Sequence, residues 1–158
     1  MQRSIEVDTT RLPFVLTTVR GGMRAEDVEE MQRRFEALFA ARRPFVTITD
    51  ARALTRVPAA PLRRAIADWN LRYRAETATY NVAAVAILDS VLGRAALRTI
   101  HWIAPHPSPY LVVASPAEAV AVAFEHLEGA GVRLSPDVHL EELMRALHGT
   151  AAERAGVG

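Results

Sequence analysis

The sequence of 158 residues contains no cysteine and no lysine, so all 19 of its cationic side chains are arginine. Without cysteine, a disulfide framework, a thiolate nucleophile, a zinc–thiolate cluster and a c-type haem attachment are excluded. Without lysine, a Schiff base, a phosphate-loop lysine and a lysine general base are excluded. Any chemistry therefore rests on Ser, Thr, Tyr, His, Asp, Glu or Arg. The arginine bias and the 28 alanines are typical of a GC-rich genome.

Long apolar runs are also missing. No stretch reaches the roughly 18 consecutive apolar residues of a membrane span, and the N-terminal MQRSIEVDTTRLPF has charges where a signal peptide needs an apolar core. We therefore expect a soluble cytoplasmic protein. The length and even composition favour a single domain over residues 1–148. The small and polar residues of 149–158 predict a flexible C-terminal tail.

Five segments have the composition of β-strands, and the first two form a hairpin by their spacing. The expected strands are Ser4–Asp8, Phe14–Val19, Phe45–Asp50, Val82–Leu88 and Tyr110–Ala114. The fourth of these is an unbroken apolar run, which is typical of an interior strand covered on both faces.

Five further segments have the apolar periodicity of helices. The expected helices are Ala25–Arg42, Ala60–Ala75, Val91–Ile103, Pro116–Glu128 and Asp137–Leu147. Ser115 and Glu118 have the spacing of a capping box, and Ser90 can cap the helix that follows it. The order β-β-α-β-α-β-α-β-α-α predicts an α/β fold, with a mixed, largely parallel sheet of about five strands and helices packed on it.

This order resembles the STAS superfamily, named after sulfate transporters and anti-sigma-factor antagonists, and especially its branch of small SpoIIAA-like, lipid-transfer-related proteins. The resemblance covers residues 4–128. It is carried by FVTITD with the proline-containing linker and long helix after it, by VAAVAIL, and by a final strand followed by SPAEAVAVAFEHL. The resemblance implies a non-enzymatic regulatory module that acts through a protein partner.

Members of this superfamily that switch by phosphorylation carry Asp-Ser-Ser/Thr-Gly after the third strand. The corresponding segment here is ARALTRVPAAP, in which Thr55 is the only hydroxyl and no glycine occurs. A degenerate version, DSVLG, follows the fourth strand and makes Ser90 the candidate phosphorylation site, although helix capping is the favoured interpretation of that serine. We therefore expect no phosphoserine switch of the usual kind.

Charge is distributed unevenly along the chain. Residues 20–98 hold 14 arginines and 9 acids, whereas residues 99–158 hold 3 arginines and 7 acids. Such polarity can steer a partner or promote head-to-tail association, which leaves a homodimer open. The candidate binding residues on the second and third expected helices are Arg63, Arg64, Arg72, Arg74, Arg94, Arg98 and Trp102. They could receive a phosphate, a carboxylate or an acidic partner, or they could form ordinary solvated helix faces.

Two alternatives to a protein-interaction module remain open. Trp69, Tyr73 and Trp102 could line a pocket for a small molecule, lipid or anion, which would need a volume of roughly 300 Å³ or more. Asp50 and Asp89 lie at the carboxyl ends of predicted strands, where open α/β sheets bind ligands, and with His101 they could serve an acid/base enzyme.

Other classes of partner find little support in the sequence. The net charge of +1, the 6% of aromatic residues and the lack of a recognised motif argue against nucleic acid. The five histidines lack the spacing of a metal site, so we expect neither a metal nor a cofactor.

Overall fold

A five-stranded sheet forms the centre of the computed structural model, which describes the backbone of residues 2–155 and the side chains of residues 2–149. The strands are β1 (Ile5–Arg11), β2 (Phe14–Gly21), β3 (Phe45–Leu54), β4 (Asn81–Ile87) and β5 (Tyr110–Val113). They lie in the order β1-β2-β3-β4-β5; β1 is antiparallel to β2, and the other neighbours are parallel. The predicted α/β fold with a mixed, largely parallel sheet is therefore confirmed.

The helices follow the predicted order with one addition. They are α1 (Ala25–Ala40), α2 (Ala60–Arg72), α3 (Arg74–Tyr80), α4 (Val91–Ile103), α5 (Pro116–Gly129) and α6 (Leu140–Ala155). The second expected helix is divided at Tyr73, whose φ of −100° and ψ of 22° depart from the helix. The Tyr73 ring stacks on Phe39 at a centroid distance of 5.8 Å, and α3 then leads directly into β4.

Two predicted boundaries are corrected. β3 continues past Asp50 to Leu54, through the segment expected to be a linker, because β2 also continues and pairs Arg20 with Ala53 and Gly21 with Leu54. The last helix begins at Leu140 and runs to Ala155, so most of the segment expected to be a tail is helical. The last three residues of that segment lie outside the described residues.

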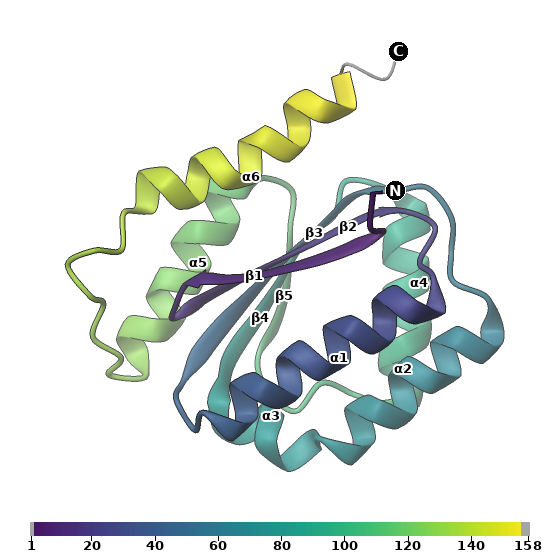
Figure 1. Ribbon diagram of the computed structural model, residues 1–158, viewed down its shortest axis with the longest axis horizontal. Coiled ribbons are helices and arrows are strands. Elements are labelled where there is room, and N and C mark those ends of the chain that lie inside the picture. The colour runs from purple at the N-terminus through teal and green to yellow at the C-terminus, as the bar shows by residue number, and fades with distance from the viewer. Residues whose placement is uncertain (1, 156–158) are drawn as a thin grey trace.

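The helices divide into two layers because each parallel strand lies next to the one before it. The connections β2-α1-β3, β3-α2-α3-β4 and β4-α4-β5 all move in the same direction across the sheet. Since such crossovers are right-handed, their helices must cover one face. Figure 1 shows α1 to α4 on that face, and α5 with α6 on the opposite one. None of the helices among the described residues is both long and apolar enough to cross a membrane.

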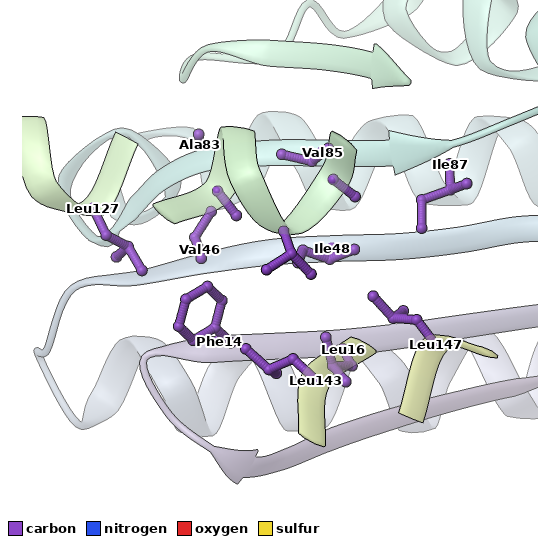
Figure 2. Close-up of a cluster of buried hydrophobic side chains, with 13 residues drawn as sticks. Phe14, Leu16, Val46, Ile48, Ala83, Val85, Ile87, Leu127, Leu143 and Leu147 are labelled. Atoms are coloured by element: carbon purple, nitrogen blue, oxygen red, sulfur yellow. The ribbon is translucent and has the colours of Figure 1, made fainter. Parts of the chain in front are cut away.

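The larger hydrophobic core lies under α5 and α6 (Figure 2). Alternate residues of the strands point into this core. Among them are Phe14, Ile48 and Ile87, each of which is 0% exposed. Leu143 and Leu147 of α6 complete the cluster. Fully burying a leucine side chain contributes about 1.5–3 kcal/mol to the free energy of folding. The burial of these two leucines therefore stabilises the packing of α6 on the core.

On the other face, the first turn of α4 packs closely against the side chain of Leu88, the residue after β4. A Cβ atom on Gly93 would lie 2.7 Å from the Leu88 side chain, closer than any van der Waals contact. The glycine therefore allows the inner face of α4, with Ala96 and Ile100, to lie directly on the sheet.

Candidate functional site

The start of α4 is fixed by Ser90. The Ser90 hydroxyl oxygen accepts a hydrogen bond from the backbone N–H of Gly93 at 3.1 Å, so this serine is the N-cap of the helix. A comparable cap holds α5, where the Ser115 hydroxyl accepts from the N–H of Glu118 at 3.3 Å. Both predicted caps are confirmed.

The side of α4 that faces away from the sheet carries an apolar stripe with two arginines. Val91, Ala95, Arg98 and Trp102 follow one another at intervals of four, three and four residues, which places them in one line along a helix. The side chains of Val91 and Trp102 are each 85% exposed. Arg94 and Leu92 flank this line, and Leu92 is also exposed. We call these six residues the α4 outer stripe.

The structure separates the candidate arginines into two groups. α2 and α4 are neighbours, as the predicted binding surface requires, but Arg74 lies on α3. Four of the arginines have local contacts: Arg63 with the Pro58 carbonyl, Arg64 with Asp68 at 3.0 Å, Arg72 over the Tyr73 ring, and Arg74 with the Pro105 carbonyl at 3.2 Å. Arg94 and Arg98 are exposed and have no hydrogen-bond or ion-pair partner among the described residues.

The acid/base candidates do not converge. Asp50 accepts two hydrogen bonds from the Arg52 guanidinium, at 2.9 and 2.8 Å. Hydrogen bonding to Asp50 raises the pKa of Arg52, and the charge of Asp89 adds to this effect. Arg52 also donates to the Leu147 carbonyl of α6, which places this group on the α5–α6 face.

His101 lies far from that group, in the last turn of α4. Its ring meets the ring of Tyr110 edge-on at a centroid distance of 4.2 Å. Tyr110 pairs with Ala84, whereas Asp50 pairs with Ile87, three residues further along β4. His101 is therefore separated from Asp50 both along the strands and by the thickness of the sheet. The three candidates for an acid/base enzyme do not form one site.

Burial favours the neutral form of the two histidines near Tyr110. Burial lowers the pKa of His101, and the neighbouring charge of His106 adds to this shift. Burial also lowers the pKa of His106. Within the part of the chain that the structure describes, no group of three or more His, Asp or Glu side chains could hold a metal ion.

A cavity of about 150 Å³ lies between the sheet and the helices α1 and α2, and it is partly open to solvent. Of the three aromatic residues considered for a pocket, Trp69 lines this cavity, whereas Tyr73 and Trp102 do not. Trp69 is held in place by a hydrogen bond from its indole N–H to the Glu36 carboxylate at 3.0 Å. The volume is about half of what the small-molecule alternative required.

Comparison with known proteins gives a fold. No family model matches the sequence, and no curated protein matches it. Among solved structures, the chain is similar to an uncharacterized protein of the DUF3478 family with a SpoIIAA-like fold, from Shewanella loihica PV-4. The two are 17% identical, the match covers 75% of this chain and 91% of the other, and the TM-score is 0.53. The chain has a SpoIIAA-like fold. The resemblance predicted from the sequence is thus confirmed at the level of the fold.

A second solved structure is an anti-sigma factor antagonist from Mycobacterium paratuberculosis, which is 13% identical, with 76% of this chain and 92% of that chain covered and a TM-score of 0.46.

Within this SpoIIAA-like fold, residues 51–61 form the end of β3, the connection to α2 and the first two residues of that helix. Thr55 is exposed there, and its backbone N–H donates to the Gly21 carbonyl at 2.9 Å. Sequence reasoning missed Thr47 and Asn81, two polar residues that line the cavity and are each 5% exposed. In the sequence, the one signal for these residues is their position: Thr47 interrupts the apolar residues of one strand, and Asn81 comes directly before the apolar run of the next.

Proposed function

We propose that this chain is a non-enzymatic, regulatory protein-interaction module that binds its partner through the α4 outer stripe. The observation that carries the proposal is the line of exposed apolar side chains on α4, which ends in a tryptophan 85% exposed. Contiguous exposed apolar side chains rimmed by polar residues mark interaction sites on soluble proteins. The partner would present apolar side chains flanked by carboxylates, complementary to Arg94 and Arg98.

The chemistry of the stripe supports a protein partner. Tryptophan and arginine are the residues that most often dominate the binding energy of interfaces. A tryptophan can place a large rigid ring in a partner's pocket, and an arginine guanidinium can hold a carboxylate with two parallel hydrogen bonds. Because Arg94 and Arg98 have no other partner among the described residues, binding a carboxylate would break no existing ion pair.

Two features support binding without catalysis or a phosphoserine switch. The sheet separates His101 from Asp50, and Asp50 is engaged by Arg52. The Ser90 hydroxyl already serves as the cap of α4. The docking surface is present in full without modification of this residue.

The test begins with a photoreactive amino acid placed at Ala95, in the middle of the stripe, in the full chain. The matched control carries the same amino acid at Glu125, an exposed position of α5 on the opposite layer. The proposal predicts a protein cross-linked from position 95 and not from position 125, and the cross-linked peptide should contain Asp or Glu beside apolar residues.

The affinity of that purified partner then decides the role of the charges. The double variant Arg94→Glu/Arg98→Glu should bind at least tenfold more weakly, whereas Arg43→Glu/Arg133→Glu, with the same change in net charge, should bind as the wild type does. Reversing the facing carboxylates of the partner to arginine should restore binding to the first variant. Equal weakening by both double variants would show that only the overall charge matters and would refute the assignment of the surface.

A further inference from the structure

Two residues that line the cavity each carry a buried polar atom without a hydrogen-bond partner among the described residues: the Thr47 hydroxyl and the Asn81 side-chain carbonyl oxygen. Both residues are only 5% exposed. Thr47 lies on β3, and Asn81 begins β4 beside it, opposite Phe45. A buried polar group without a partner is costly and is rarely retained in a native protein, so this pair requires an explanation.

The walls around this pair are aromatic and flat. Phe35 and Phe39 of α1 and Trp69 of α2 form one side, and Tyr110 of β5 contributes another. The Phe35 and Trp69 rings contact each other edge-on, with their centroids 6.3 Å apart, and together form one aromatic wall. Such walls fit a planar ring, which gains from both its apolar area and its ring geometry.

No charged residue that could balance an ion lines this space. The lining contains neither arginine nor a carboxylate, and burial lowers the pKa of His106, which favours its neutral form. An ion without a counter-charge is strongly disfavoured in such surroundings. The size gives a further limit, because an apolar cavity of about 150 Å³ in another protein accommodates benzene.

We propose that this cavity binds a small, planar, uncharged compound with an amide or hydroxyl group, whose ring lies between Phe35, Trp69 and Tyr110 and whose polar group bonds to Thr47 and Asn81. The Asn81 oxygen can only accept, so the ligand must offer an N–H or O–H donor. The Thr47 hydroxyl can donate or accept, and it therefore suits the second polar atom of an amide. This site is separate from the α4 outer stripe and does not depend on the proposed function.

The test uses tryptophan fluorescence, because the chain has two tryptophans and one of them, Trp69, lines the cavity. The variant Trp102→Phe leaves Trp69 as the single reporter. Three probes of similar shape are titrated: benzamide, benzoate and toluene. The proposal predicts a saturable change with benzamide, at least tenfold weaker binding of benzoate, and weaker binding of toluene.

A matched pair of substitutions then locates the polar contact. Thr47→Val removes the hydroxyl from the cavity, and Thr17→Val removes another buried hydroxyl without a partner that does not line it. The first should weaken benzamide binding about threefold to tenfold, the loss expected for one hydrogen bond, and leave toluene unchanged; the second should change neither. Ala84→Val narrows the cavity beside Thr47 and should abolish binding even if Thr47→Val does not fold.

Three results would overturn the proposal. One is the absence of a saturable change with benzamide up to its solubility limit, which would mean that the polar pair holds internal water only. Another is binding of benzoate as tight as that of benzamide. The third is equal affinity for benzamide in the Thr47→Val and Thr17→Val variants, which would make the cavity an apolar void without polar recognition.

Discussion

The pair formed by Asp50 and Arg52 offers a direct test of whether Asp50 is structural. The Asp50 side chain is 3% exposed and that of Arg52 is 10% exposed, and two hydrogen bonds join them. The variant Asp50→Ala leaves a guanidinium buried at the junction of β3 and α6. Removal of one partner of a buried pair destabilises a protein by about 3–5 kcal/mol, so we expect the free energy of unfolding to fall by that amount.

Replacement of both partners should cost far less. In Asp50→Leu/Arg52→Met neither charge of the pair remains buried, and apolar replacements of buried pairs are often neutral or stabilising. The double variant does lose the hydrogen bond from Arg52 to the Leu147 carbonyl. We expect this loss to lower the free energy of unfolding by about 1 kcal/mol. The double variant should thus be more stable than Asp50→Ala by about 2–4 kcal/mol.

The assay is unfolding in urea at pH 7, followed by circular dichroism. The control is Arg64→Met, which breaks the exposed pair with Asp68, where the side chains are 68% and 56% exposed; it should cost less than about 1 kcal/mol. The reasoning fails if Asp50→Ala costs no more than this control, or if the double variant is less stable than the single one.

Three further predictions concern stability. Hydrogen bonds from the Ser4 hydroxyl and backbone, together with Arg24, lower the pKa of the buried Asp27 carboxyl. The ionised Asp27 therefore contributes its full stabilisation of the folded protein above about pH 4, the usual pKa of Asp in an unfolded chain. This stabilisation should be lost as the pH falls through the lower folded-state pKa, and Asp27→Asn should flatten this part of the pH profile of the urea midpoint. Ser90→Ala should cost about 1 kcal/mol in thermal unfolding, whereas Ser90→Asp should retain the cap; equal losses would exclude capping as the role of this serine. Gly93→Ala should cost about 1–3 kcal/mol, because its Cβ would lie 2.7 Å from the Leu88 side chain, whereas Gly129→Ala, which has open space around it, should not destabilise the protein in the same unfolding assay.

The positions of the strands could be predicted from the sequence because composition and alternation are local signals. The apolar run of β4 and the two serine caps were found in this way. The extension of β3 to Leu54 was not, because it depends on pairing with Gly21 of β2, more than 30 residues away. The division at Tyr73 was missed for a similar reason, since its ring packs against α1.

The candidate site could be predicted in part. Arg94, Arg98 and Trp102 lie on one helix, and their spacing alone places them on one face. The local contacts of Arg63, Arg72 and Arg74 depend on the loops and on α3, which the sequence does not place. Asp50 and His101 are separate because they lie on opposite faces of the sheet. A shift of one residue in the expected strand would move Asp50 to the other face, so the sequence could not predict this separation.

The affinity of the α4 outer stripe for its partner tests the central claim most directly. Trp102→Ala should weaken binding of the cross-linked partner about thirtyfold or more, as expected for a tryptophan that contributes at least about 2 kcal/mol. The free energy of unfolding should change by less than about 0.5 kcal/mol, because the side chain is 85% exposed. A dissociation constant within twofold of the wild-type value would contradict the claim that this module binds its partner through α4.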